Sequence, residues 1–209
     1  MGSKGVLKTD QQSHCKLEWF AISGAHEQIT DCPWQNPTAL DFCSHGRREL
    51  SYAARDGHVN FTQQLMEKGA ELEAGDESSR TPLSWAAGEG HEAVVTQLLA
   101  TGKVDVHSKS NNGRTPLSWA ARWGHETVVK QLLATGKVDV NSKDNDGWTP
   151  LLLAAANGHT AVVKQLLATG KVDVNSKSKH FGWTPLSLAA AKGHEAVVKL
   201  LVEKGAKRS

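Results

Sequence analysis

The chain lacks the features that mark several large classes of protein. It has three cysteines among 209 residues, an odd number that does not make a disulfide framework. No apolar run approaches the length of a transmembrane helix, and the first residues contain no apolar stretch resembling a signal peptide. The formal net charge is only +2, which gives no electrostatic reason to expect nucleic acid or a membrane as partner. We therefore expect a protein of the cytoplasm, with the nucleus as the alternative.

The sequence also lacks the short patterns of common active sites. No phosphate-binding loop, paired-carboxylate or kinase-like pattern is present. Ser84, Ser118 and Ser187 are not part of a Gly-x-Ser-x-Gly turn, so none is expected to act as a nucleophile. The cysteines of residues 1–43 form no Cys-x-x-Cys pair, and their irregular spacing does not fit zinc. We predict no enzyme activity, no cofactor and no metal; a zinc or catalytic site in residues 1–43 stays as the alternative.

What the sequence has instead is a repeated unit. Thr-Pro-Leu begins at Thr81, Thr115, Thr149 and Thr184, and Gly-His follows each copy at Gly90, Gly124, Gly158 and Gly193. A weaker copy starts at Gly46. The residues that precede the Thr-Pro pairs in this register are separated by 33, 34, 34 and 35 residues. A nearly fixed period of this length indicates a solenoid, in which each unit packs only on its neighbours.

The repeated unit predicts two helices and an arm. Thr149 is a good helix N-cap, and Pro150 suits the first helical position, where a missing N–H costs nothing. Gly158 ends this first helix. The second helix is expected from about Thr160 to Ala168, with an apolar stripe too wide for a helix that is covered on only one side. An extended arm then leads to the next Thr-Pro pair.

The pattern Thr-Pro-Leu-x-x-Ala-Ala-x-x-Gly-His-x-x-Val-Val-x-x-Leu-Leu resembles the ankyrin repeat. The resemblance implies an all-α solenoid of helix–turn–helix repeats with β-hairpin arms. About five repeats are expected, near residues 44–76, 77–110, 111–144, 145–179 and 180–209, after a partly disordered non-repeat segment at 1–43. More narrowly, Ala-Thr-Gly-Lys-Val-Asp-Val-Asn-Ser-Lys resembles fungal-type ankyrin arrays, such as those of NOD-like and NACHT multidomain proteins.

Three details of the repeats predict structural roles. The Gly-His histidines recur evenly at the helix–helix turn, so we expect them to bond turn backbone rather than to hold a metal. The first repeat lacks the Thr-Pro pair and has Thr62 where Val95 stands in the next copy, as terminal repeats commonly differ. The His that usually follows Thr-Pro-Leu is absent, and its hydrogen bonds must be replaced or lost at Ser84, Ser118, Leu152 and Ser187.

The candidate functional surface consists of arginines, tryptophans and a few polar residues. In the ankyrin pattern the arm tips, the residue before Thr-Pro and the two residues after Ala-Ala line one concave face. The resemblance therefore implies a protein partner there, of unknown identity, and exposed Trp and Arg often dominate such interfaces. The predicted partner-binding residues are Arg55, Arg80, Arg114, Arg122, Trp123, Trp148, Asn157, Phe181, Trp183 and Lys192.

An alternative stays open for the tryptophans. Trp148 and Trp183 can instead lie flat on neighbouring arms, or stack on Arg114, and only stiffen the array. Trp85 and Trp119, directly before Ala-Ala, are expected to be partly buried packing residues.

The last repeat raises a second kind of function. Leu200 stands where earlier copies have Gln131 and Gln165, and no polar capping repeat follows in this sequence. We expect this repeat to fray, to self-associate or to have continued into further repeats. The sequence thus favours a non-catalytic, protein-binding solenoid. A self-assembling array, or the sensor fragment of a larger receptor-like protein, is the alternative.

Overall fold

The structure is a computed structural model that describes residues 46–207. The chain divides into two units after Cys43, and every described residue belongs to the second unit, Ser44–Ser209. The expectations of disorder, zinc binding or catalysis in residues 1–43 lie outside the described residues.

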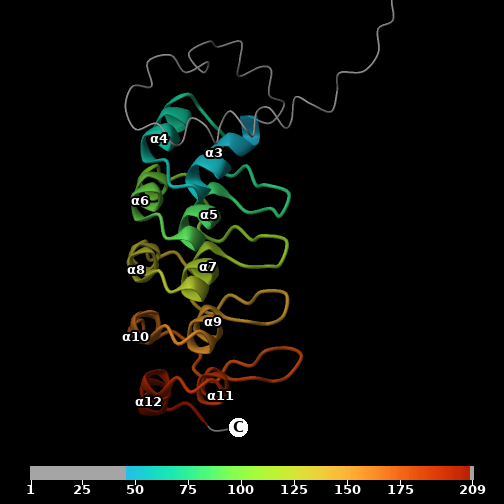
Figure 1. Ribbon diagram of the computed structural model, residues 1–209, viewed down its shortest axis with the longest axis vertical. Helices are drawn as coiled ribbons and strands as arrows, with labels where there is room; N and C mark the ends of the chain where they lie inside the picture. The colour runs from blue at the N-terminus through green and yellow to red at the C-terminus, as the bar shows by residue number, and fades with distance from the viewer. Residues whose placement is uncertain (1–45, 208–209) are drawn as a thin grey trace, which may run out of the picture. The chain divides into compact units, whose positions relative to one another are not determined.

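The described residues form ten helices in five antiparallel pairs, and they contain no strand. The pairs are α3 (Gly46–Arg55) with α4 (Val59–Glu67), α5 (Pro82–Glu89) with α6 (Glu92–Ala100), α7 (Pro116–Trp123) with α8 (Glu126–Ala134), α9 (Pro150–Ala156) with α10 (Thr160–Ala168), and α11 (Pro185–Ala191) with α12 (Glu195–Glu203). The first helices stack in one column and the second helices in another (Figure 1). This arrangement confirms the all-α repeat solenoid. None of these helices combines the length and the apolar character needed to cross a membrane.

Each first helix from α5 onward begins as its Thr-Pro pair predicts. The Thr149 hydroxyl oxygen accepts a hydrogen bond from the Leu152 N–H at 3.2 Å, and Pro150 occupies the first helical position. At the other end, Gly90 and Gly124 follow α5 and α7 with φ 80°. Glycine adopts this left-handed conformation without steric cost, so it ends the helix and starts the turn.

A network of hydroxyl groups stands in for the missing His. Thr81 Oγ1 lies 3.2 Å from Ser84 Oγ and 3.1 Å from Ser108 Oγ, which belongs to the arm leading into the next repeat. The contact between helix start and arm recurs between Thr115 and Ser142 at 3.4 Å and between Thr149 and Ser176 at 3.3 Å. At three of the four positions a serine side chain therefore bonds the N-cap threonine, at Ser84, Ser118 and Ser187, whereas the Leu152 side chain makes no hydrogen bond.

One continuous apolar core runs through all five pairs, from Ala54 to Leu201. In α10, Val162, Val163 and Leu166 are completely buried, as the wide apolar stripe predicts. This helix packs on α9 within its own pair and on α8 and α12 of the adjacent pairs. A pair therefore buries its apolar surface only with the help of both neighbours.

The Gly-His histidines connect each pair to the one before it. Nε2 lies 2.8 to 2.9 Å from a backbone carbonyl oxygen in three copies, His91 on Arg55, His125 on Gly88 and His159 on Arg122. Because a carbonyl oxygen only accepts hydrogen bonds, Nε2 carries the proton in each case. The structural role is confirmed, and the bond reaches back to the preceding pair rather than closing the histidine's own turn.

The arms run out and back, but they are held by turns rather than by a β-ladder. The Ser110 N–H donates to the Arg114 carbonyl oxygen at 3.1 Å within one arm. Between arms, the Asn111 N–H donates to Ser78 O at 2.8 Å, and the Asn145 N–H donates to Asn112 O at 3.0 Å. A single backbone bond between neighbouring tips does not make a ladder, so the expected β-hairpins contain no strand in the described residues.

The first pair departs from the others where the sequence indicates. Thr62 is completely buried, and its hydroxyl has no hydrogen-bond partner among the described residues. Val95 fills the same place in the next pair and is equally buried. In α3, which has no Thr-Pro start, Ser51 Oγ ties the helix to its arm by donating to Ala74 O at 2.8 Å.

Two glycine substitutions should separate backbone strain from the contact with the next histidine. Gly124 and Gly136 both have positive φ, but a Cβ on Gly124 would lie 2.5 Å from His159 Nδ1, and one on Gly136 would meet nothing within 4 Å. We expect Gly136→Ala to lower the free energy of unfolding by about 1 kcal/mol. Gly124→Ala should cost about 2 to 3 kcal/mol, because the His159 bond is also displaced. Urea unfolding measures both, and equal losses would contradict the role of the histidine.

Candidate functional site

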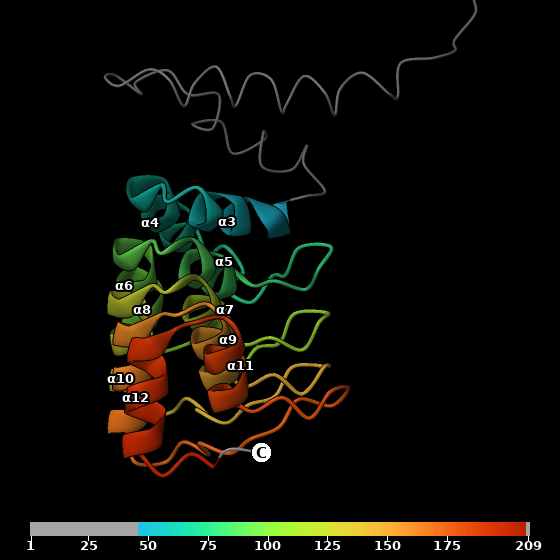
Figure 2. The ribbon, with the colours of Figure 1, turned by 60° about the horizontal axis from the view of Figure 1, so that its bottom comes forward.

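The arms and the first helices form one side of the stack, which we call the arm face. Every arm projects from the column of α5, α7, α9 and α11, on the side away from the second helices (Figure 1 and Figure 2). We define the arm face by the residues predicted to bind a partner: Arg55, Arg80, Arg114, Arg122, Trp123, Trp148, Asn157, Phe181, Trp183 and Lys192.

These residues differ in whether a partner can touch them. Phe181 is 81% exposed, Trp123 is 55% exposed and Trp183 is 37% exposed. Arg80, in contrast, is only 9% exposed, so the expectation of an exposed side chain is wrong for this residue. The others are either exposed, as Asn157 and Lys192 are, or half-buried, as Arg55, Arg114, Arg122 and Trp148 are.

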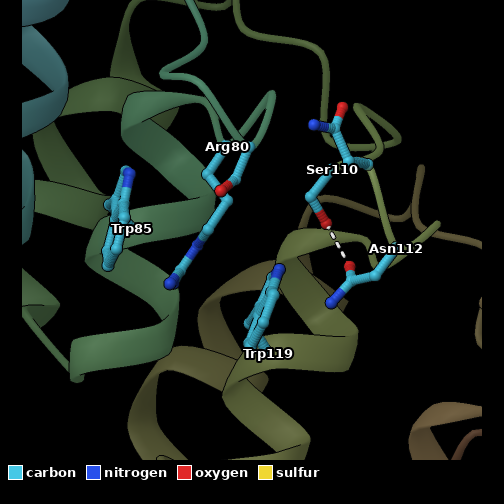
Figure 3. Close-up of a pocket in the computed structure, with 7 residues that line it drawn as sticks. Arg80, Trp85, Ser110, Asn112 and Trp119 are labelled. Atoms are coloured by element: carbon cyan, nitrogen blue, oxygen red, sulfur yellow. Dashed lines mark hydrogen bonds between the residues drawn. The ribbon is translucent and has the colours of Figure 1, made fainter.

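Arg80 is buried because two tryptophan rings enclose it. Its guanidinium carbon lies 3.4 Å from the ring centre of Trp85 and 4.1 Å from that of Trp119 (Figure 3). Burial lowers the pKa of Arg80 to about 10, while the charges of Glu89 and Asp76 act in the opposite direction. A group with this pKa is still protonated at neutral pH, so the two rings hold a full positive charge.

The same kind of contact extends to the neighbouring repeats. The guanidinium carbon of Arg55 lies 5.1 Å from the ring centre of Tyr52 and 5.7 Å from the ring centre of Trp85. The guanidinium carbon of Arg114 lies 5.2 Å from the ring centre of Trp119. A hydrogen bond to Asp56 is the main reason why the pKa of Arg55 is raised. Together these side chains form an arginine–aromatic stack, made of Tyr52, Arg55, Trp85, Arg80, Trp119 and Arg114.

Arg114 also joins the stack to the next arm. Its Nε donates to Asp144 Oδ2 at 3.0 Å, and the Asp144 side chain is only 1% exposed. The other carboxylate oxygen of Asp144 accepts from the Trp148 N–H at 2.8 Å and from the Asp146 N–H at 3.1 Å. The alternative that Trp148 stacks on Arg114 is therefore not what the structure has, since Arg114 contacts Trp119 and Asp144 instead.

Repeats four and five replace this stack by apolar contacts. Trp148 is half-buried against the apolar cluster of Leu152, Ala156 and Leu188, which lie on α9 and α11 rather than on a neighbouring arm. Trp183 is more exposed and meets Phe181 edge to face, with ring centres 6.4 Å apart. Trp123 stands apart at the end of α7, where Arg122 lies 5.4 Å from its ring centre. Burial lowers the pKa of Arg122, and the nearby charge of Arg114 lowers it further.

Sequence reasoning missed the arginine–aromatic stack although the signal was present. In repeats two and three an arginine precedes a tryptophan by five residues, at Arg80 and Trp85 and again at Arg114 and Trp119. Repeats four and five have Trp and Leu at these two positions. Because the spacing is identical in stacked repeats, these side chains lie above one another. The recurrence of the Arg and Trp pair in two successive repeats could therefore have predicted the stack.

Among residues 46–207, no three His, Cys, Asp or Glu side chains gather as metal ligands would. The Ser84 and Ser118 hydroxyls are buried in the network at the helix starts.

Helix pairs in register, histidines that bond the preceding pair and arms on one side define a helical repeat protein with an elongated surface for contacts. The model of ankyrin repeats, which comprises three copies, matches residues 50–144 and again residues 127–208. The chain therefore belongs to the ankyrin repeat family, whose repeats are generally modules for protein–protein interaction. No curated protein is similar enough to the chain to count as a match.

Two tryptophan substitutions should distinguish the hydrogen-bonded ring of the stack from the one without a bond. Trp85 Nε1 donates to Asp76 Oδ2 at 3.0 Å, whereas Trp119 Nε1 is buried with no acceptor among the described residues. Trp85→Phe should lower the free energy of unfolding by about 1.5 to 3 kcal/mol through loss of the hydrogen bond to the charged Asp76. The smaller ring should lower it further, because ring contacts are also lost. Trp119→Phe loses only ring contacts, so urea unfolding should find it the milder change; a cost as large as that of Trp85→Phe would contradict this difference.

Proposed function

We propose that the chain is a non-catalytic binding protein, and that it contacts a protein partner through the arm face of repeats three to five. The observation that supports this most is the exposure of three aromatic side chains there, Trp123, Phe181 and Trp183. Large exposed apolar side chains are unfavourable in water unless they serve a contact, and aromatic residues are enriched at the centres of protein interfaces.

The surroundings of these side chains also favour binding. Asn157 and Lys192 are exposed beside the ends of α9 and α11 and supply polar groups of the kind found at an interface rim. Asn157 is held in place because its Nδ2 donates to Leu153 O at 2.9 Å. The bonds between successive arm tips keep the backbone of this face ordered, so a partner loses little free energy in fixing it.

The proposal predicts that removing the exposed aromatic side chains weakens binding without unfolding the array. Proteins captured from an extract of the source cells are first identified with the wild-type chain, and their affinities are then measured by calorimetry. Trp123→Ala or Trp183→Ala should cost about 2 kcal/mol, or about thirtyfold in affinity. Lys130→Ala, on the exposed side of α8, is the matched control and should bind as the wild type does. Equal affinities for all variants would rule out the arm face.

Self-association through the last repeat is a second candidate function. Val202 on α12 is 49% exposed, and Val198 and Leu200 beside it are only half-buried. A Cβ on Gly193 would meet nothing within 4 Å among the described residues, whereas the equivalent glycines of the earlier pairs lie against the next histidine. This open end of the stack has the features of a surface that receives another helix pair.

Sedimentation across a wide range of protein concentrations tests this second candidate. If the last pair associates, the mean mass should rise with concentration, and Val202→Lys should suppress the rise because it places a charge in the contact. Lys199→Ala leaves the apolar side chains in place and serves as the control. A mass that stays monomeric throughout would exclude self-association.

A further inference from the structure

One arm position alternates between aspartate and serine along the stack. Asp76, Ser110, Asp144 and Ser178 each donate their backbone N–H to the carbonyl oxygen of the residue before the Thr-Pro pair, at 3.0 to 3.1 Å. This shared bond shows that the four residues are structurally equivalent, although their side chains differ. The consequences of the difference can be read by comparing neighbouring repeats.

Where the residue is aspartate, its two carboxylate oxygens accept hydrogen bonds from different parts of the protein. Asp76 Oδ1 accepts from the N–H groups of Ser78 and Arg80, at 2.8 and 2.9 Å, and so holds the arm's own turn. Asp76 Oδ2 accepts from Trp85 Nε1 at 3.0 Å. In Asp144 the division is the same, and Oδ2 accepts from Arg114 Nε at 3.0 Å. The second oxygen therefore serves the arginine–aromatic stack.

In repeat three Ser110 stands at this position, and the second oxygen is missing. The Ser110 hydroxyl lies 2.7 Å from Asn112 Oδ1 and 3.0 Å from Arg114 O, so it is occupied within its own arm. A carboxylate at this position would accept hydrogen bonds from two donors. One is Trp119 Nε1, which is equivalent to Trp85 Nε1, and the other is Arg80 Nε, which is equivalent to Arg114 Nε. Both nitrogens are buried and have no acceptor among the described residues.

The two residues that carry these donors line the same cavity. It has a volume of about 240 Å³ and is lined by Arg80, Trp119 and Ser110, with Trp85 and Asn112 beside them (Figure 3). Arg80 is 9% exposed and charged, and its remaining bond, from Nη2 to Ser84 O, is 3.2 Å long. Asp76 does not accept a hydrogen bond from these two donors, because its Oδ1 already bonds its own arm and its Oδ2 already bonds Trp85.

We propose that this cavity binds a carboxylate, supplied by an aspartate or glutamate side chain of the protein partner. A carboxylate offers one acceptor oxygen to each of the two N–H groups, and its negative charge pairs with the charge of Arg80. Both nitrogens are covered in the empty site, so the carboxylate enters as the Trp119 ring or the Arg80 side chain turns toward it. The assignment rests on the proposed function, which it deepens by naming the chemistry of one partner residue.

The test follows the indole N–H of Trp119 directly. The protein is labelled with ¹⁵N in its tryptophan side chains, and Trp119→Phe identifies the Trp119 signal. The probe is N-acetylglutamate α-methylamide, whose only carboxylate is the side chain; N-acetylglutamine methylamide is its neutral control, and N-acetylalanine carries a terminal carboxylate. With the first probe, the Trp119 signal should move downfield until it saturates. With the neutral control it should not move, and the Trp85 signal should keep its position with both. No shift, an equal shift with the amide, or a response to N-acetylalanine alone would overturn the assignment.

Two matched serine substitutions complete the experiment. Ser110→Asp supplies the missing oxygen internally, so the Trp119 signal should lie downfield without probe and should no longer respond to it, and urea unfolding should find the variant more stable. Ser178→Asp makes the same change in repeat five, where Trp148 and Leu188 stand in the places of Arg80 and Trp119, and should leave the Trp119 response unchanged. If Ser110→Asp responds as the wild type does, the cavity is not the carboxylate site.

The identified partner separates this inference from the proposed function. Ser110→Asp should weaken partner binding at least tenfold, and Ser178→Asp should not. If Trp123→Ala weakens binding and Ser110→Asp does not, the arm face binds the partner but the carboxylate site is refuted. If neither change matters while the probe still shifts Trp119, the cavity binds carboxylates and the arm-face function is refuted.

Discussion

The structure depends on the fact that no helix pair can bury its apolar surface alone. The second helices carry a wide stripe of apolar side chains, and the stripe of α10 is covered by α9, α8 and α12 together. The histidine that bonds the preceding pair sets the register of this packing, because its ring occupies the space over a glycine where a side chain would collide. Stability is therefore a property of neighbouring pairs, as expected for a one-dimensional array.

The same register determines the chemistry of the arm face. Since equivalent residues lie above one another, a tryptophan in one repeat and its counterpart in the next form two walls, and Arg80 fits between them. The stack stops after repeat three, where Arg and Trp give way to Trp and Leu. The arm face therefore has a part whose arginines are used internally and a part whose aromatic side chains are free for contact.

Near-identical repeats also act as internal controls for one another. Trp85 and Trp119 occupy equivalent positions, yet among the described residues only the Trp85 indole has a hydrogen-bond acceptor, and the difference follows from Asp76 in one arm and Ser110 in the other. A buried N–H without an acceptor is costly, and two residues with such an N–H in the described part of the chain, one of them charged, line the same cavity. The comparison between repeats points to a ligand group without reference to any other protein.

The sequence by itself determined the repeat, its helices and their caps, because these depend on local chemistry and on period. Thr149, Pro150 and Gly158 act at the places that their own backbone preferences indicate, and α10 has the bounds Thr160–Ala168 that the pattern predicts. Only the tertiary structure decided which side chains of the candidate site are accessible. Arg80 is hidden because stacking brings it against Trp119, 39 positions further along the chain, and that contact is invisible in any single repeat. Trp123, in contrast, stays exposed. The two N–H groups near Ser110 that have no acceptor in residues 46–207 come together in the same way, since they belong to different helix pairs.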